Sequence, residues 1–513
     1  MKKHVLSLLG LCCLCGLQAQ QTYQNPVIHG DVADPTIIRV NQTYYAAGTS
    51  SEWAPFYPLY QSSDLVNWVQ IGHLFDQQPE WTKSSFWAPE LFQYKGKTYV
   101  YYTARRKSDG ISYIGVATAD SPAGPYTDHG VVVEYGTEAI DAFILEDGGD
   151  LYISWKAYGL DKRPIELLGC KLSDDGLRLD GEIFSLLKDD ERRGMEGQHW
   201  LKAGDYYYLI YSVNGCCGPQ SDYAVAIARS KYLKGPYEKY EGNPILHGDG
   251  KTVQSCGHGT IATTPDGRMF YLCHAYLTGD DFFMGRQPIL QEIVLGEDDW
   301  FHFKEGEEAK LQHPTPFPRT AQQPVFAFQD DFASRKLNVA WSWNYPYSTP
   351  DIRLEKGRLS LQGTLKPDCT GGTALCLRPE ASLYCMETAV ANQNQAWKGL
   401  TLYGDDKNYV TFGVQGDNLQ LKMVKSGEDI VLSEPIPLPE NQAVVYLRMQ
   451  VKGGHPESFS YSLDNRSWLS IQEEKNGLQK SLVQWDRVAR PGLFQQGAGA
   501  AEFEYVRMSY PIR

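Results

Sequence analysis

The stretch KTYVYYTARR, residues 97–106, is one of five similar segments that recur along the chain. Each copy is rich in tyrosine or other large apolar residues, and each follows a short turn that carries Gly, Asn or Asp. Their spacing is 55, 53, 55 and 63 residues. Because aromatic residues favour strands, each copy predicts a strand–turn–strand unit. The other copies are QTYYAAGTS (42–50), DLYISWKAYG (150–159), DYYYLIYSV (205–213) and RMFYLCHAY (268–276).

A second element follows most of these copies. It places polar turn residues between two short strand-like runs, as in SSDLVNW (62–68) and ARSKYLKGPY (228–237). Four strands in a repeat of roughly fifty residues, without helical periodicity, are typical of a β-propeller blade. The five repeats therefore predict a five-bladed β-propeller over residues 20–310, since an ordinary β-sandwich would not require five copies in phase.

The repeat pattern stops after Phe303. Residues 311–324, LQHPTPFPRTAQQP, contain four prolines and predict a linker. Beyond the linker, runs such as YVTFGV and LQLKMV are separated by polar turns, which predicts a β-sandwich over residues 325–513. The predicted fold class is all-β, a propeller followed by a sandwich.

The first residues are typical of an export signal. Lys2 and Lys3 precede an uncharged apolar run that ends at Leu17, and the small residue Ala19 follows. This pattern predicts a signal peptide over residues 1–19 and a secreted or periplasmic protein. No later run is long enough to span a membrane. The net charge of −14 argues against nucleic acid and anionic membranes as partners and is compatible with a neutral sugar. The sequence leaves the oligomeric state open.

Acidic residues and one histidine occupy similar positions in all five repeats. Because the innermost strand of each blade lines the propeller axis, we expect these residues to face a common pocket. A single acid such as Asp34, which precedes a proline, could simply cap a turn. Several in register indicate a site in which carboxylates shift one another's pKa, as acid–base cleavage of a glycosidic bond requires. The residues lie nine to twelve positions before the Tyr-rich strands: Asp34, Glu90, Asp141, Glu196 and His258.

At this point the motifs resemble glycoside hydrolase family 43, in particular its β-xylosidases and α-L-arabinofuranosidases. The resemblance covers residues 22–303 and includes FWAPELF (86–92), IDAFILEDGGDLYISW (140–155), GMEGQHW (194–200) and CGHGTI (256–261). It implies an inverting reaction in which Asp34 is the general base and Glu196 the general acid. Asp141 would orient the acid and raise its pKa. The acid and base carboxyl groups should lie about 6.5–9.5 Å apart.

The chain departs from the family pattern at two positions. Ala142 and Gln198 stand where proline is common, which puts loop shape and substrate preference in doubt but removes no catalytic group. The resemblance also implies that Arg286 lies beneath the pocket and polarises a carboxylate or a sugar hydroxyl. It implies that His258 holds a calcium ion or a water at the axis, although a purely structural role for this histidine is an equal alternative.

Two aromatic residues are candidate sugar platforms. Trp87 and its neighbour Phe86 lie in the FWAPELF motif, and the C–H face of a pentose packs well on an aromatic ring. Simple core burial is the alternative for Trp87. Cys216 and Cys217 lie in NGCCGPQ (214–220), where a vicinal disulfide would form a rigid apolar plate beside the leaving-group subsite. Free thiols or bonds to other cysteines are the alternatives.

The segments DDFASRKLNVAWSWNYP (330–346) and AEFEYVRMSY (501–510) resemble the concanavalin-like, jelly-roll domain attached to many family 43 β-xylosidases. The expected function is removal of terminal pentose units from plant cell-wall polysaccharide or its oligosaccharides, without a required cofactor. The sequence leaves open which pentose is removed. Two alternatives compete with this interpretation: a glycan-binding propeller without catalysis, and a retaining fructan hydrolase, whose signature motifs are absent.

Overall fold

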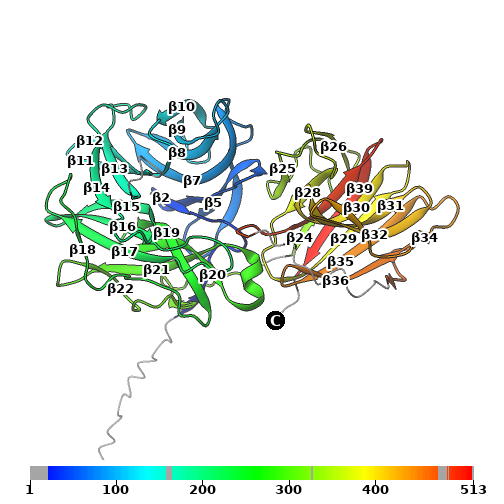
Figure 1. Ribbon diagram of the computed structural model, residues 1–513. Coiled ribbons are helices and arrows are strands. Elements are labelled where there is room, and N and C mark those ends of the chain that lie inside the picture. Colours follow the sequence, from blue (N-terminus) through cyan, green and yellow to red (C-terminus); the bar gives the residue numbers. More distant parts are fainter. Residues whose placement is uncertain (1–20, 158–163, 325–326, 472–481, 483–484, 511–513) are drawn as a thin grey trace, which may run out of the picture.

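The computed structural model describes residues 21–157, 164–324, 327–471, 482 and 485–510, so the predicted signal peptide lies outside the described residues. The N-terminal half contains five four-stranded antiparallel sheets, which confirms the predicted propeller (Figure 1). The first two blades contain β2 (Thr36–Val40), β3 (Thr43–Ala47), β5 (Phe56–Ser62) and β6 (Val69–Phe75), then β7 (Thr82–Tyr94), β8 (Lys97–Arg106), β9 (Ser112–Ala119) and β10 (Thr127–Val133).

The remaining three blades repeat the same order of strands. The third contains β11 (Ala139–Asp147), β12 (Asp150–Ala157), β13 (Glu166–Lys171) and β14 (Phe184–Lys188). The fourth contains β15 (Met195–Ala203), β16 (Tyr206–Val213), β17 (Ala224–Ser230) and β18 (Glu238–Lys239). The fifth contains β19 (Val253–Thr263), β20 (Met269–Leu277), β21 (Gln287–Leu295) and β22 (Phe301–Phe303), with the 3₁₀ helix η1 (Gly279–Met284) after β20. The Tyr-rich segments are the second strands, as predicted.

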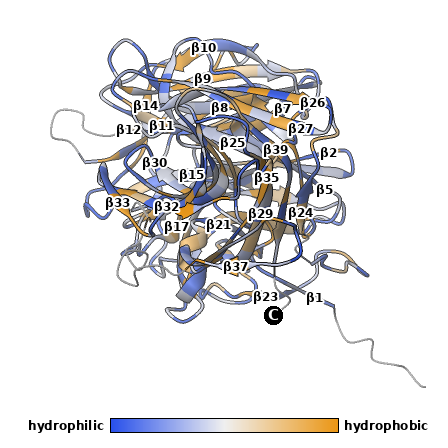
Figure 2. Ribbon diagram, turned by 90° about the vertical axis from the view of Figure 1, so that its right-hand side faces the viewer, coloured by the Kyte–Doolittle hydropathy of each residue, from blue (hydrophilic) through white to orange (hydrophobic). Residues whose placement is uncertain are grey.

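The first strands of consecutive blades lie against one another in a closed ring, in which β19 of the fifth blade returns to β2 of the first. The apolar residues between blades form five separate clusters, each drawn from two adjacent blades. Tyr101 and Tyr102 show why the second strands are so aromatic: their side chains point to opposite faces of the sheet and enter the clusters on either side. Figure 2 shows hydrophobic residues concentrated in the strands, whereas many peripheral loops are hydrophilic.

A β-bulge interrupts four of the five first strands at the same level. At each bulge the pairing register shifts, and a residue adopts a positive φ angle. Bulges re-aim side chains and recur beside functional sites. The first blade places a residue of the same conformation just before β2. The five residues are Asp34 (φ 52°), Ala88 (41°), Asp141 (59°), Gly197 (59°) and His258 (45°).

Strand β1 (Thr22–Gln24), before the first blade, pairs with β23 (Gln312–Pro314), after the last, in a separate two-stranded sheet that joins the two ends of the propeller. The side chain of Asn25 strengthens the closure, because its amide accepts from Leu290 N–H and donates to Leu290 O. The predicted linker over residues 311–324 is therefore not a plain connector: its first part is a strand that belongs to the propeller.

The C-terminal half is a two-sheet β-sandwich, as predicted, with its main core between the sheets. One sheet contains β26 (Ser348–Glu355), β27 (Arg358–Leu365), β39 (Ala501–Ser509), β29 (Leu383–Ala391), β35 (Val444–Lys452), β36 (His455–Ser462) and β37 (Leu469–Ser470), with β24 (Phe328–Asp330) beside β39. The other contains β33 (Glu428–Val431), β32 (Asn418–Lys425), β31 (Asn408–Gln415), β30 (Trp397–Asp405), β38 (Arg490–Gln496), β28 (Thr373–Leu377) and β25 (Trp341–Asn344), with β34 (Ile436–Pro437) beside β32.

The two domains share a sheet. Strand β4 (Trp53–Ala54) leaves the first blade and pairs with β25, so the propeller supplies the edge strand of the second sandwich sheet. Trp53 packs in a cluster of sandwich residues that includes Trp397 and Tyr403. The Arg490 guanidinium lies 4.1 Å from the centre of the Trp53 ring. Within the described residues, no helix is long and apolar enough to cross a membrane.

Candidate active site

The structure brings Asp34, Asp141 and Glu196 together at the propeller axis. Asp34 and Asp141 occupy the positive-φ positions of the first and third blades, and Glu196 directly precedes the corresponding residue of the fourth. Asp34 and Asp141 are 8% and 6% exposed. His258 of the fifth blade links the two aspartates, because its Nδ1 lies 3.4 Å from Asp34 Oδ1 and 3.8 Å from Asp141 Oδ2. Three of the five axial positions thus carry or adjoin a carboxylate.

Asp34 is surrounded by groups that favour its ionised form. The Thr49 hydroxyl donates to Oδ2 at 2.6 Å, and Arg286 Nη1 lies 3.3 Å from Oδ1. Burial alone would raise the pKa of Asp34, but Arg286 and His258 outweigh it and hold the pKa well below its usual range. Asp34 is therefore ionised near neutral pH, which a general base requires.

His274 lies beneath Asp34 as a neutral ring. The Asp34 backbone N–H donates to His274 Nδ1 at 3.0 Å, so the ring hydrogen belongs on Nε2. Burial lowers the pKa of His274 to about 4, which agrees with this neutral form. The ring stacks on Tyr223, with 5.6 Å between the ring centres. His274 therefore supports the backbone of Asp34 rather than acting as a charged partner.

Glu196 forms an ion pair that the sequence analysis did not predict. Lys156 Nζ lies 2.7 Å from Glu196 Oε2, and the Tyr223 hydroxyl donates to Oε1 at 3.0 Å. Burial would raise the pKa of Glu196, but the charge and hydrogen bond of Lys156 hold it below the usual value. Lys156 lies on β12 of the third blade and also faces Glu138 Oε2 at 4.0 Å. Glu196 is therefore held in its ionised form.

Asp141 has no comparably close cation. Its Oδ2 accepts from the Gly197 backbone N–H at 3.1 Å. The pKa of Asp141 is raised to about 7, chiefly by burial; His258 and Lys156 act to lower it, and the nearby Glu196 acts to raise it. Below that pH the proton of this carboxylate set is carried by Asp141. Because the repulsion between Asp141 and Glu196 is mutual, the expectation that Asp141 raises the pKa of Glu196 stays a prediction.

Gln198 and His199 continue the fourth-blade strand behind these carboxylates. Gln198 Nε2 donates to the Asp141 carbonyl oxygen at 2.6 Å, so the residue that replaces the usual proline fixes the bulge. His199 is buried against Phe143, and burial lowers its pKa to about 3. Glu90 lies two residues past the equivalent bulge residue, Ala88, and accepts from the Thr36 hydroxyl at 2.8 Å. Glu90 therefore does not occupy the axial position that the sequence spacing predicts, because the bulge around Ala88 shifts the register of this strand.

The two aromatic candidates differ in position. Trp87 is partly exposed, with the Arg105 guanidinium 5.7 Å from its ring centre, so it keeps surface for a ligand. Phe86 is 0% exposed and packs against Phe56 and Tyr345, at ring-centre distances of 4.2 and 5.7 Å. The expectation that Phe86 contacts sugar is therefore wrong, because its ring lies in the core between the first two blades.

His258 is the residue that the family resemblance implies as a holder of calcium or water at the axis. Its Nδ1 faces Asp34 and Asp141, and a Cβ atom at Gly197 would lie 2.6 Å from its Cγ, so the ring is closely enclosed. Among the described residues, no group of three or more His, Cys, Asp or Glu side chains is arranged to hold a metal ion. The side chains present do not fit a directly held calcium ion, and no chemical step is assigned to one.

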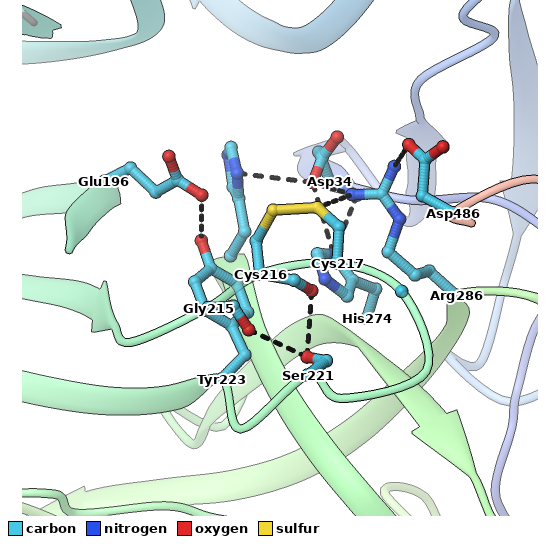
Figure 3. Close-up of a disulfide and its surroundings, with 12 residues drawn as sticks. Asp34, Glu196, Gly215, Cys216, Cys217, Ser221, Tyr223, His274, Arg286 and Asp486 are labelled. Atoms are coloured by element: carbon cyan, nitrogen blue, oxygen red, sulfur yellow. Dashed lines mark hydrogen bonds and ion pairs between the residues drawn. A yellow bond between two sulfur atoms is a disulfide. The ribbon is translucent and has the colours of Figure 1, made fainter. Parts of the chain in front are cut away.

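A vicinal disulfide joins Cys216 and Cys217 in the loop between β16 and β17. Figure 3 shows it beside the carboxylates, with Arg286 reaching both Asp34 and the sulfur of Cys217. Arg286 Nη1 lies 3.7 Å from Cys217 Sγ. The other cysteines of the described chain are free. The sequence left open a vicinal disulfide, free thiols or bonds to other cysteines, and the structure contains the vicinal disulfide.

The sandwich also contributes to the site. Asp486, just before β38, lies 3.9 Å from Arg286 Nη2, and Arg487 lies 3.6 Å from Glu52 Oε1 of the propeller. Trp485 contacts the disulfide loop at Gly218, where a Cβ atom would lie 2.4 Å from Trp485 Nε1. No local sequence pattern marked these residues or Lys156, since their place in the site depends on contacts between distant segments.

A five-bladed propeller with clustered axial carboxylates and an attached sandwich defines a glycosidase architecture, and comparison with known families agrees. The profile of Glycosyl hydrolases family 43 matches residues 23–301, and that of the Beta xylosidase C-terminal Concanavalin A-like domain matches residues 329–509. The chain therefore belongs to glycoside hydrolase family 43 and carries this C-terminal domain.

Relatives with different activities resemble the chain to a similar degree. It is 27% identical over 496 residues to a beta-xylosidase of Bacillus subtilis, covering 87% of this chain and 90% of the relative. It is 29% identical over 433 residues to a non-reducing end alpha-L-arabinofuranosidase of Bacteroides ovatus, covering 79% and 78%. A xylan beta-1,4-xylosidase from Bacillus halodurans shares the fold, with a TM-score of 0.82, 23% identity, and coverage of 95% of this chain and 100% of that structure.

Proposed function

We propose that this protein is an exo-acting, inverting glycosidase that removes terminal α-L-arabinofuranosyl or β-D-xylosyl residues from plant hemicellulose or its oligosaccharides. The observation that carries the proposal is the unequal electrostatics of the carboxylates. Asp34 is held ionised by Arg286, whereas burial raises the pKa of Asp141 to about 7. The axis therefore holds an ionised base and an available proton at the same pH.

In the proposed reaction, Asp34 removes a proton from a water molecule as its oxygen attacks the anomeric carbon. Glu196 donates a proton to the glycosidic oxygen as the bond to the leaving sugar breaks. Glu196 must first gain that proton, and its ion pair with Lys156 at 2.7 Å opposes this step. A sugar hydroxyl that draws Lys156 away removes the main support for the ionised form, and Asp141, as the neighbouring protonated carboxyl, can supply the proton.

The proposal is tested by nitrophenol release from the α-L-arabinofuranoside and the β-D-xylopyranoside, measured side by side. We expect Asp34→Ala and Glu196→Gln each to lower kcat/KM by about 10²–10⁴-fold, with thermal unfolding close to that of the wild type. Proton NMR of the first sugar released should show the inverted anomer. A folded wild type that hydrolyses neither pentoside but binds xylo-oligosaccharide would instead support a non-catalytic glycan-binding propeller.

We further propose that the chain is exported and that residues 1–19 are removed. The charged start, the apolar run and Ala19 support this proposal. N-terminal mass analysis of the mature protein should give Gln20 as the first residue. A mature protein that begins at Met1 would contradict the proposal.

A further inference from the structure

The vicinal disulfide lies at the wall of the catalytic pocket. One nitrogen of Arg286 is 3.3 Å from the carboxylate of Asp34 and 3.7 Å from Cys217 Sγ (Figure 3). Both cysteines are partly exposed, so the disulfide presents some of its surface to solvent. Such a bond offers two adjacent sulfurs and their methylenes without a strong hydrogen-bond donor. The wall beside the catalytic base is therefore apolar at this point.

The loop that carries the disulfide is fastened on several sides. The Ser221 hydroxyl donates to Gly215 O at 2.9 Å or to Cys216 O at 3.0 Å, and it lies 2.8 Å from Ser255 Oγ. The Gly218 N–H donates to the Tyr276 hydroxyl at 3.1 Å. These contacts tie the fourth-blade loop to β19 and β20 of the fifth blade. Because the surface is already ordered, a ligand that packs on it loses little free energy in arranging it.

Trp485 extends this surface outward. Its side chain is 63% exposed, although its indole contacts Gly218 directly. The following residue, Asp486, lies 3.9 Å from Arg286, which anchors the segment to the catalytic site. A large aromatic side chain left this exposed beside a catalytic pocket is typical of a ligand-binding surface. The disulfide and the indole thus form one apolar surface, from the Arg286–Asp34 pair to the pocket rim.

The carboxylates and the disulfide–Trp485 surface lie at different depths, and this difference determines which sugar of the substrate each one contacts. Asp34 and Asp141 are buried, whereas Trp485 is 63% exposed, so we expect the terminal sugar that is cut off to occupy the deeper position, beside the carboxylates. The sugar on the other side of the cleaved bond then lies at the rim. We propose that Cys216–Cys217 and Trp485 form the subsite for the leaving-group sugar, and that this sugar is a pyranose, whose flat C–H face matches the apolar surface.

This inference rests on the proposed function and narrows it. A pyranose leaving group is found when a pentose is released from a xylan-type chain, whether that pentose is xylose or arabinose. It is not found when arabinose is released from a chain of arabinofuranose. The surface therefore points to substrates with a xylan-type backbone rather than to arabinan.

The test compares two substrates with the same terminal pentose. One is the oligosaccharide in which this pentose is linked to xylopyranose, and the other is the corresponding pentosyl fluoride, whose leaving group is too small to occupy the rim. In Trp485→Ala, and in the double variant Cys216→Ser/Cys217→Ser, we expect the ratio of kcat/KM for the oligosaccharide to that for the fluoride to fall roughly tenfold. An unchanged ratio in both variants would overturn the proposal.

Matched controls exist in the chain. Tyr232→Ala removes another exposed aromatic side chain, 70% exposed, on the outer part of the fourth blade. Cys369→Ser removes a partly exposed free cysteine of the sandwich. Neither residue lies at the site, and both variants should keep the wild-type ratio. Thermal unfolding of each variant shows whether the double cysteine change has disturbed the fold, and Trp485→Ala keeps the test valid if it has.

A binding measurement separates this inference from the proposed function. Xylobiose is titrated by calorimetry into Glu196→Gln and into Glu196→Gln/Trp485→Ala. We expect affinity to fall roughly tenfold when the tryptophan is removed. If the wild type hydrolyses neither pentoside, the proposed function fails, but this comparison still decides whether the surface binds sugar. Equal affinities, or no binding to either protein, would overturn the inference.

Discussion

Asp34, Asp141 and Glu196 are the same kind of group in one pocket, and their immediate neighbours distinguish them. Asp34 lies 3.3 Å from Arg286, and Glu196 lies 2.7 Å from Lys156. Asp141 accepts from the Gly197 N–H at 3.1 Å, and His258 Nδ1 lies 3.8 Å from its Oδ2. A nearby cation stabilises the ionised form, whereas burial without one stabilises the neutral form. The proposed division of roles between base and proton carrier therefore depends on one arginine and one lysine.

Lys156 should control the alkaline limit of activity. Its charge lowers the pKa of Glu196, so Lys156→Met should raise that pKa. An acid that must be protonated then stays competent to a higher pH, and the alkaline limb of kcat/KM against pH should move up by about 1 unit or more. Lys156→Arg, which keeps the charge, is the control and should retain the wild-type limb. An alkaline limb that stays in place or moves down in Lys156→Met would contradict the assignment of Glu196 as acid.

At the scale of elements, the bulges convert a repeated strand into a catalytic site. Four of the five first strands shift register at a positive-φ residue near the axis, and the shift changes the direction in which the neighbouring side chains point. The fourth blade has Gly197 at this position, so its carboxylate comes from the preceding residue, Glu196. A glycine is needed because the ring of His258 occupies the space of a Cβ atom. Both the positive φ angle of Gly197 and its close packing against the fifth blade thus favour glycine at this position.

Gly197→Ala should lose both stability and activity. The new Cβ atom would lie 2.6 Å from His258 Cγ, and the ring would be pushed away from Asp34 and Asp141. Gly204→Ala is a matched control, because Gly204 directly follows the same strand, has φ 56° against 59°, and has open space around it. We expect the control to lose about 1–2 kcal/mol of unfolding free energy from backbone strain alone.

The two glycine variants are compared by thermal unfolding and by kcat/KM. Gly197→Ala should unfold at a lower temperature than Gly204→Ala and should also lose roughly tenfold or more in kcat/KM, since a small displacement of catalytic groups is costly. Equal activity in the two variants would show that the His258 ring has no positional role.

At the scale of the whole molecule, the propeller and the sandwich are joined at two places. Strand β4 of the propeller completes a sandwich sheet, and the segment that contains Trp485 and Asp486 returns to the catalytic pocket. The two connections lie at different places in the chain, which limits how the domains can move relative to one another. The C-terminal domain thus contributes residues to the surroundings of the active site.

Trp53→Ala should test the connection between the domains. Trp53 is 5% exposed and packs in a sandwich cluster, so its truncation leaves a cavity and should cost about 3–5 kcal/mol in unfolding free energy. Trp468→Ala, which removes a less buried indole stacked on Arg448, should cost clearly less. Denaturant unfolding followed by fluorescence makes the comparison. Similar losses in the two variants would mean that β4 contributes little to domain association.

The sequence by itself determined the blade repeat, the sandwich and the gathering of Asp34, Asp141 and Glu196 at one axis. These features follow from strand periodicity and from regular spacing between turns, both of which are local. Five near-copies must then place equivalent positions around a common centre. The family motifs added the chemical roles, which stay predictions until the carboxylate variants are measured.

The tertiary structure alone decided which side chains complete the site. It buried Phe86, paired Lys156 with Glu196, and brought Trp485 to the disulfide loop from hundreds of residues away. Nothing in the local pattern distinguishes these residues from others of their type. Their positions result from the closure of the propeller ring and from the return of the sandwich to the pocket. A pKa or an exposed surface depends on such long-range neighbours, because charge and burial act through space rather than along the chain.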